Sequence, residues 1–252
     1  MVFPLTIRQA VAALILSLLL LSPAVAQGTG EERAFQEAER YYAAGMRQSE
    51  NLQKGRYMTY VIGLYTNYIE NYSGSKNEAA ARFHLGYARQ SLGRIEEAKS
   101  TYRFLVERHR RGPHVGQASR QMAYLYFVEE NWEEAATYFG VASQNLPDRN
   151  LRYTALSKQV ECLLKLDRRA EVAVALRQII DIEDHPHKDW ATFMLAYQYF
   201  ERDDFDTAIR LLKPLVKSET QSQYHSQAIF YTGLASAELG LEGDQDAHLK
   251  TV

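Results

Sequence analysis

A spacing of 36–37 residues recurs along this chain and constrains its fold more than any other feature. In the clearest copy a small residue is followed by bulky residues four and seven positions later, at Ala98, Tyr102 and Leu105. The triplets in the same register are Val61/Tyr65/Tyr68, Ala135/Phe139/Ala142, Val172/Leu176/Ile179 and Ala208/Leu212/Leu215. Steps of four and three place side chains on one face of a helix. A fixed period of this length therefore predicts an all-α solenoid of stacked helical hairpins.

The stretch 78–112 contains the best-defined hairpin. Its apolar pattern predicts a first helix from about residue 76 to 92 and a second from about 95 to 109. Gly93 is expected to make the turn, because glycine readily adopts the left-handed conformation that ends a helix. Ala98 is small because two helices are expected to cross closely there, and a larger residue would overpack the contact.

Helical patterns also cover the N-terminal region. Phe35, Ala38, Tyr42 and Met46 predict a helix over about 31–53, and a second helix is expected over about 56–72. The array then divides into about five hairpins and a partial unit. Their approximate ranges are 31–75, 76–113, 114–148, 149–186 and 187–220, followed by the partial unit 221–252.

The first 26 residues read as a cleaved secretory signal peptide. An apolar run over 11–21, interrupted only by Ser17, precedes Pro23 and an Ala24-Val25-Ala26 cleavage pattern. This run is shorter than the roughly 20 residues of a membrane-spanning helix. Residues 27–30 are expected to form a flexible start. No cysteine lies near the cleavage point, so no lipid anchor and no membrane span after cleavage are expected.

Composition and motifs argue against several classes of function. The formal net charge of −2 lacks the basic excess typical of a nucleic-acid-binding protein. The chain contains no G-x-S-x-G, H-E-x-x-H or P-loop pattern, so no enzyme activity and no cofactor are expected. Its single cysteine, Cys162, cannot form an intrachain disulfide and is expected to be buried and inert.

Several residues of the repeat resemble the tetratricopeptide repeat. They are Leu85-Gly86, Gly93, Ala98, Tyr102 and Leu105, then Ala135, Phe139, Ala142 and Pro147. The resemblance covers roughly 31–250 and implies a right-handed superhelix. The departures are Arg89, at a position that is usually aromatic, and a third unit that lacks the turn glycine.

The spacing and the segment 65–75 resemble a bacterial envelope subgroup of this family. The subgroup includes the Tol–Pal-associated periplasmic protein and the lipoprotein subunit of the outer-membrane assembly machine. This resemblance implies a periplasmic scaffold for protein–protein interaction in cell-envelope assembly or maintenance.

In this family the first helix of each hairpin lines a concave face that binds partners. The resemblance assigns to that face Phe83, Tyr87, Arg120, Tyr124, Phe127, Trp190, Phe193, Tyr197, Phe200 and Phe230. In the third unit the same register gives Ser157, Glu161 and Leu164. An aromatic groove suits a protein or peptide partner with apolar anchors. An aromatic stripe at helical spacing is also typical of a core, and both interpretations stay open.

Three alternatives accompany the scaffold hypothesis. The array could position a cell-wall enzyme, or bind a glycan or a metal ion directly. The loop 184–189 offers two histidines, but Asp189 is expected to cap the next helix, so no metal site is assigned. A homo-oligomer could form through the terminal half-unit, where Phe230, Tyr231 and Leu239 are expected to be poorly covered.

Overall fold

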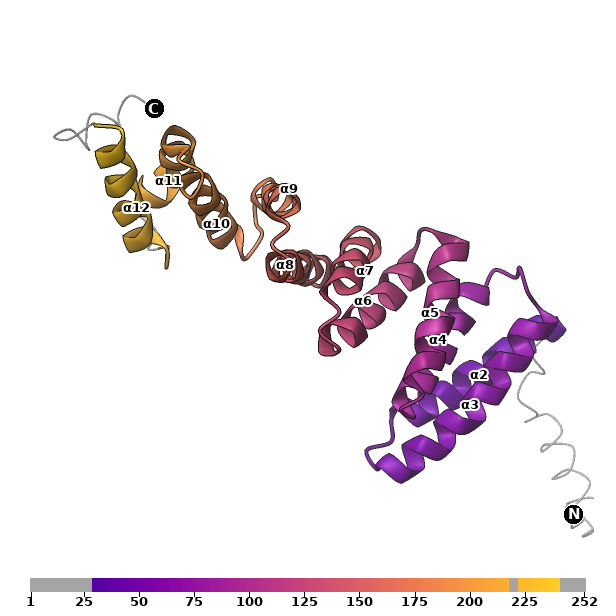
Figure 1. The fold of residues 1–252 in the computed structure, drawn as a ribbon. Helices are drawn as coiled ribbons and strands as arrows, with labels where there is room; N and C mark the ends of the chain where they lie inside the picture. Colours follow the sequence, from indigo (N-terminus) through magenta and orange to yellow (C-terminus); the bar gives the residue numbers. More distant parts are fainter. Residues whose placement is uncertain (1–28, 218–221, 241–252) are drawn as a thin grey trace, which may run out of the picture. The chain divides into compact units, whose positions relative to one another are not determined.

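The computed structural model describes residues 29–217 and 222–240, and every regular element in these ranges is a helix. The signal-peptide prediction for residues 1–26 lies outside the described residues. The helices (Figure 1) are α2 (Gly30–Met46), α3 (Asn51–Asn71), α4 (Glu78–Ser91), α5 (Ile95–His109), α6 (Pro113–Val128), α7 (Trp132–Asn145), α8 (Arg149–Lys165), α9 (Arg169–Ile180), α10 (Lys188–Phe200), α11 (Phe205–Lys217) and α12 (His225–Glu238). The all-α prediction is confirmed.

The chain divides into two compact units between Leu92 and Gly93. The described part of the N-terminal unit contains α2, α3 and α4, and that of the C-terminal unit contains α5 to α12. None of the helices described in either unit is both long and apolar enough to cross a membrane.

In the N-terminal unit α3 packs against both α2 and α4. The predicted triplet Val61, Tyr65 and Tyr68 on α3 is fully buried. It forms one apolar cluster with Ala38 of α2 and with Leu85 of α4. A single face of α3 therefore supplies most of the bulk that fills this core.

The predicted helix over 31–53 is too long, and the prediction is wrong there. α2 ends at Met46, and α3 already begins at Asn51. A Cβ added at Gly45 would lie only 2.8 Å from Tyr57 Cβ, so the two helices approach closely at the reversal. Residues 47–50 carry no glycine or proline that would announce a break.

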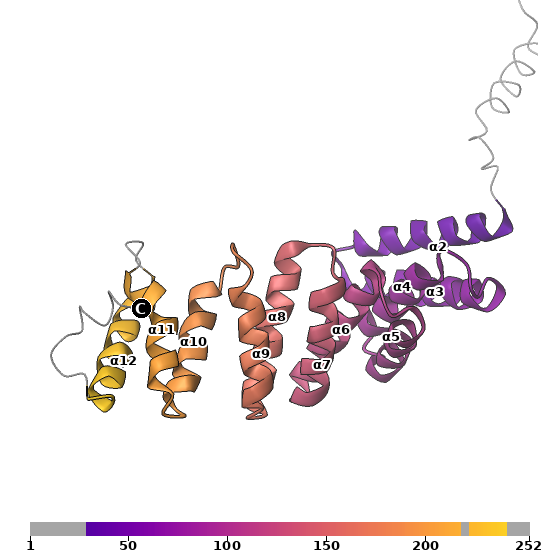
Figure 2. The same ribbon diagram turned by 90° about the horizontal axis from the view of Figure 1, so that it is seen from above.

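In the C-terminal unit each helix packs against the next one along the chain, and α12 also contacts α10. Figure 2 shows α6 to α12 side by side. The predicted triplets are all at most 3% exposed: Ala98/Tyr102/Leu105, Ala135/Phe139/Ala142, Val172/Leu176/Ile179 and Ala208/Leu212/Leu215. The repeat register and the solenoid of hairpins are thus confirmed.

The turns inside the hairpins keep one backbone conformation while the residue type changes. Gly93 has φ 74°, as predicted, and Glu130, Asp167 and Asp203 at the corresponding positions have φ 58°, 51° and 59°. A left-handed conformation is strained for residues other than glycine. The turn at Asp167 is closed by a bond from Arg168 N–H to the Leu163 carbonyl, at 3.1 Å. This bond satisfies a carbonyl at the helix end and offsets the strain.

Candidate functional site

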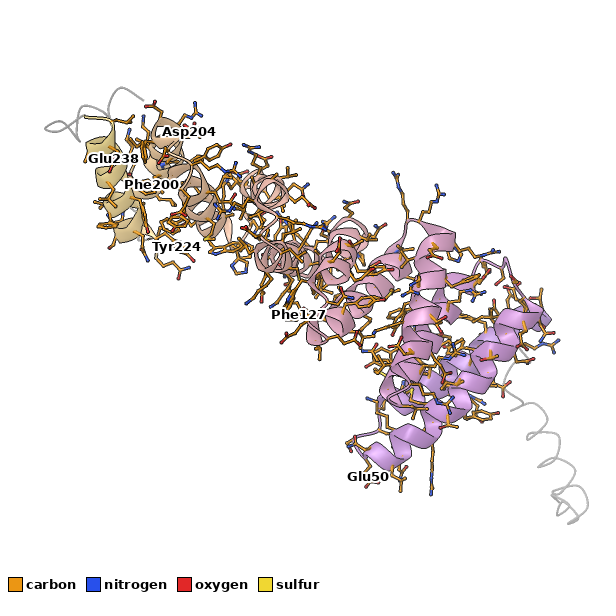
Figure 3. All side chains as sticks on the ribbon, viewed as in Figure 1. Glu50, Phe127, Phe200, Asp204, Tyr224 and Glu238 are labelled. Carbon is orange, nitrogen blue, oxygen red and sulfur yellow. The ribbon has the colours of Figure 1, made fainter. Side chains whose placement is uncertain are left out.

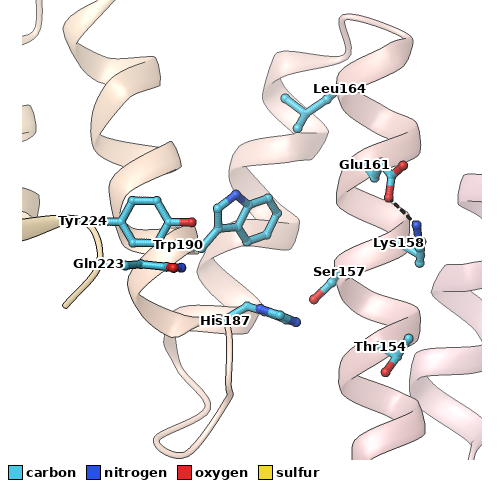
Figure 4. A pocket seen from close by; sticks show the side chains of 9 residues that line it. All are labelled: Thr154, Ser157, Lys158, Glu161, Leu164, His187, Trp190, Gln223 and Tyr224. Carbon is cyan, nitrogen blue, oxygen red and sulfur yellow. Dashed lines mark hydrogen bonds and ion pairs between the residues drawn. The ribbon is translucent and has the colours of Figure 1, made fainter. Parts of the chain in front are cut away.

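A cleft of about 590 Å³ lies in the C-terminal unit between α8 and α10 (Figure 4). We call it the α8–α10 cleft. Its lining residues are Thr154, Ser157, Lys158, Glu161 and Leu164 of α8, His187 and Trp190 at the start of α10, and Gln223 and Tyr224 just before α12. Its volume falls in the range typical of ligand-binding pockets.

The α8 wall follows from the two faces of that helix. Tyr153, Leu156, Val160 and Leu163 recur every three or four residues and are buried. The cleft residues of α8 have the same spacing on another face. They are mostly polar and none of them is a fully buried residue, so this face is left to line the cleft.

The opposite wall is aromatic. Trp190 projects from the first turn of α10 toward α8 (Figure 4). The Tyr224 ring stacks on Phe193, with 5.4 Å between the ring centroids and an interplanar angle of 19°. The N-cap of α10 is His187, and Asp189 lies in the first turn, so the prediction that Asp189 caps this helix is wrong.

The two charges in the cleft neutralise each other. Lys158 Nζ lies 2.7 Å from Glu161 Oε2. The same Nζ lies 4.7 Å from the centroid of the Phe127 ring, which places a cation over an aromatic face. The pair gives the cleft no net charge.

Several polar groups of the cleft have no hydrogen-bond partner within the described residues. The buried Ser157 Oγ is one. The Trp190 indole N–H, the Gln223 side-chain amide and the Tyr224 hydroxyl likewise have none in the described ranges. Polar groups held beside aromatic rings and free of internal partners are typical of a binding site.

The structure brings together some of the residues assigned to the partner face. Trp190 lines the cleft with Ser157, Glu161 and Leu164 of the third unit. Phe127 adjoins it through Lys158. Phe193 contributes indirectly, because its ring stacks on the ring of Tyr224.

Two other assigned groups lie outside this cleft lining. Tyr124 makes an edge contact with the buried Phe139 at 5.1 Å, and the Arg120 guanidinium lies over the Tyr124 ring at 5.8 Å. Tyr197 and Phe200 surround Tyr231, at 5.3 and 5.2 Å (Figure 3 labels Phe200).

The terminal helix α12 is only partly as expected. Phe230 is 60% exposed and Leu239 is 36% exposed. Tyr231 is half-buried among the aromatic residues of α10, so the expectation that it is poorly covered is wrong. The oligomer hypothesis for this end of the chain stays a prediction.

The remaining assigned residues, Phe83 and Tyr87, belong to the N-terminal unit. Phe83 is only 8% exposed and therefore belongs to the buried core. Tyr87 is half-buried and makes an edge contact with Tyr42 at 6.1 Å. Phe83 is therefore not an exposed groove residue, and the assignment of Tyr87 to the partner face stays a prediction.

Sequence reasoning missed Thr154, Lys158, His187, Gln223 and Tyr224 of the cleft. Lys158 is adjacent to an assigned position, so a wider helical face would have included it. His187, Gln223 and Tyr224 precede the helices that they adjoin. A register counted along helices gives no signal for such residues.

The loop before α10 holds a buried histidine. His185 is 4% exposed, and its Nδ1 accepts a hydrogen bond from His187 N–H at 3.0 Å. Burial, with a smaller effect of His187, lowers the pKa of His185. In the described part of the chain no group of three or more His, Cys, Asp or Glu residues gathers to hold a metal ion.

Cys162 lies on α8 but is fully buried, as predicted. Burial raises the pKa of its thiol to about 11. Because the thiolate is the reactive form, this side chain is inert at neutral pH.

Comparison with known proteins finds one matching family model and similar solved structures. Residues 80–110 match the family model of the tetratricopeptide repeat. A tetratricopeptide repeat protein from Parabacteroides merdae ATCC 43184 is 14% identical, with a TM-score of 0.46 over 88% of this chain and 83% of that chain. The PilF structure from Pseudomonas aeruginosa is 13% identical, with a TM-score of 0.42 over 88% of this chain and 98% of that chain. No curated protein matches this chain.

The matched segment contains the Leu85-Gly86 pair, the Gly93 turn and the buried triplet of α5. These are among the residues that carry the resemblance to this family. This chain therefore contains a tetratricopeptide repeat at residues 80–110, within an all-α solenoid of helical hairpins.

Proposed function

We propose that this protein is a secreted, periplasmic scaffold that binds a partner peptide in the α8–α10 cleft. Tetratricopeptide repeats generally mediate protein–protein interaction, and this supports a protein partner. The observation that carries the proposal is that Trp190, Gln223 and Tyr224 line the cleft with side-chain polar groups that have no hydrogen-bond partner in the described residues. We place the partner in cell-envelope assembly or maintenance, on the resemblance to envelope proteins of this repeat family.

The chemistry of the cleft suits a peptide. A peptide backbone alternates hydrogen-bond donors and acceptors, and the exposed Gln223 amide offers both kinds of group. Trp190 and Tyr224 supply large, rigid contact surfaces for an apolar side chain at a small entropy cost. Phe193 already holds the Tyr224 ring by stacking, so less freedom is lost on binding.

The proposed location rests on residues 1–26. A short apolar run followed by an Ala-Val-Ala pattern is typical of a secretory signal, and no cysteine is available for a lipid anchor there. Cell fractionation tests this part of the proposal. We expect the mature chain in the periplasmic fraction without detergent, and recovery from the cytoplasm would contradict it.

Site-specific crosslinking tests the cleft. A photoreactive phenylalanine analogue at position 190 is expected to capture a protein partner in cells. The same analogue at position 230 is the matched control, because Phe230 is 60% exposed in the same unit but does not line the cleft. Capture from position 230 alone, or from neither position, would contradict the assignment.

A further inference from the structure

We infer that the occupant of the α8–α10 cleft is an extended, proline-bearing segment in the polyproline II conformation. This inference rests on the proposed function and specifies the kind of peptide that is bound. It follows from comparing the walls of the cleft with the ways in which proteins recognise peptides.

A helical peptide does not fit the α8 wall. An amphipathic helix docks through apolar anchors that recur at every turn, and it needs an apolar groove to receive them. The wall instead presents Thr154, Ser157, the Lys158–Glu161 pair and only Leu164 as an aliphatic side chain. A helix docked here would bury its apolar face against polar groups without bonding them.

Two other recognition modes are also unsuited to this cleft. Addition of a strand requires an exposed sheet edge, and the walls of the cleft are helices with a short connecting segment. Recognition of a phosphorylated or acidic motif requires a cluster of arginines or other cations. The one lysine of the cleft, Lys158, is neutralised by Glu161.

A polyproline II segment matches the groups that remain. This conformation has no internal hydrogen bonds, so its carbonyls are open to donors from a protein. The Trp190 indole N–H, the Tyr224 hydroxyl and the Gln223 amide are such donors, and none has a partner in the described residues. Proline rings pack on aromatic faces, and the conformation is already ordered before binding.

The arrangement of the two aromatic residues supports this assignment. Trp190 enters the cleft from α10, and the Tyr224 hydroxyl points toward it from the segment before α12 (Figure 4). Each ring has its own neighbour. The Trp190 ring meets His187 at 6.3 Å, and the Tyr224 ring stacks on Phe193. The Tyr224 ring is therefore held in place before a ligand arrives.

Tryptophan fluorescence gives a direct test. The chain has two tryptophans. Replacing Trp132, which lies on α7 against Phe127, with phenylalanine leaves Trp190 as the sole reporter. The full W132F chain is titrated with a proline-rich peptide and with the same peptide carrying alanine in place of proline. We expect saturable quenching or a spectral shift with the proline-rich peptide, and affinity about tenfold lower or worse with the alanine peptide.

Substitutions at Trp190 and Tyr224 test whether the peptide binds in the cleft. Calorimetric titration of Trp190→Ala and Tyr224→Phe is expected to show affinity reduced about tenfold and several-fold, respectively. Phe230→Ala, an exposed aromatic outside the cleft, is expected to bind like the unmodified chain. Circular dichroism melting checks that each variant remains folded, and Tyr224→Phe keeps the stacked ring.

The outcomes separate this inference from the function on which it rests. Equal binding of the proline and alanine peptides, or tighter binding of a helical or acidic peptide, overturns the inference while a peptide-binding scaffold stands. A shift with chitin oligosaccharides and with no peptide overturns both, because the site would then recognise a glycan. Unchanged affinity of Trp190→Ala places the peptide elsewhere and overturns the inference.

Discussion

Two buried tyrosines of the N-terminal unit differ from the aromatic residues of the α8–α10 cleft in what their polar ends contact. In the N-terminal unit the Tyr65 hydroxyl donates to Glu39 at 2.6 Å, and the Tyr68 hydroxyl donates to Glu31 at 3.0 Å. In the α8–α10 cleft the polar ends of Trp190 and Tyr224 have no partner among the described residues. The hydroxyls of Tyr65 and Tyr68 are bonded inside the protein, whereas the polar ends of Trp190 and Tyr224 leave bonding capacity open to a ligand.

This difference separates structural aromatic residues from candidate binding residues. Tyr65 is fully buried, and its pKa is raised by burial and by the hydrogen bond to Glu39. The Tyr42 ring stacks on His84 at 4.3 Å, which closes the same cluster. An aromatic side chain whose polar end is already bonded stabilises the fold and has little left to offer a partner.

The largest expected effect contrasts one residue from each unit. Tyr65→Ala removes a fully buried ring and should lower the free energy of unfolding by about 3–5 kcal/mol. Trp190→Ala removes a half-buried ring at the edge of the cleft and should cost about 1 kcal/mol or less. Urea denaturation measures both values. Equal losses would show that Trp190 is a core residue and would remove the contrast.

Glycine substitutions extend the comparison to backbone packing. A Cβ at Gly116 of α6 would lie 2.5 Å from the Asn145 carbonyl carbon, so Gly116→Ala should destabilise the chain by about 1–3 kcal/mol. Gly63 of α3 meets nothing within 4 Å, so Gly63→Ala should stabilise it by about 0.5–1 kcal/mol. Thermal unfolding of the two variants should move in opposite directions. A rise in melting temperature for Gly116→Ala would mean that α6 and the end of α7 are loosely packed.

Removing single hydroxyl groups tests the polar ends themselves. Tyr68→Phe breaks bonds to Glu31 and Ser75 and should cost about 1–1.5 kcal/mol. Tyr224→Phe removes a hydroxyl with no described protein partner, so stability should change by about 0.5 kcal/mol or less. Denaturant unfolding of Tyr68→Phe and Tyr224→Phe measures both changes in stability. A clear loss of stability in Tyr224→Phe would indicate an internal partner and would weaken the case for the cleft.

The smallest expected effect is a pH dependence from His185. Its folded pKa is lowered by burial and by His187, with Asp184 acting in the opposite sense, so the unfolded chain binds the proton first as pH falls. Stability should therefore decline as pH drops through about 6.5, the ordinary histidine value, toward the lowered pKa. Above about pH 6.5, His185 should contribute nothing to the pH dependence of the free energy of unfolding. Between pH 7.5 and 5, the free energy of unfolding of His185→Gln should decline less steeply than that of the unmodified chain. An equal slope in the two proteins would assign the pH dependence to other groups.

The register of the hairpins was predictable from the sequence because burial in stacked helices imposes it. Ala98, Tyr102 and Leu105 recur as a pattern since each repeat must fill the same space between helices. The Gly93 turn was predictable for a similar reason, because glycine is the residue that best tolerates its left-handed conformation. The same turn at Asp167 was not visible, since the closing backbone bonds that hold it appear only in the fold.

The sequence by itself determined an all-α repeat and a set of aromatic residues on its first helices. Only the tertiary structure decided that Phe83 is buried, that Tyr231 is covered and that Trp190 lines a cleft. The physical reason is that the state of a side chain depends on neighbours distant in sequence. Glu39 reaches His84 across 45 residues, and the cleft joins α8 to α10 and to the segment before α12. A periodic pattern records which face of a helix is apolar, but it does not record what lies opposite that face.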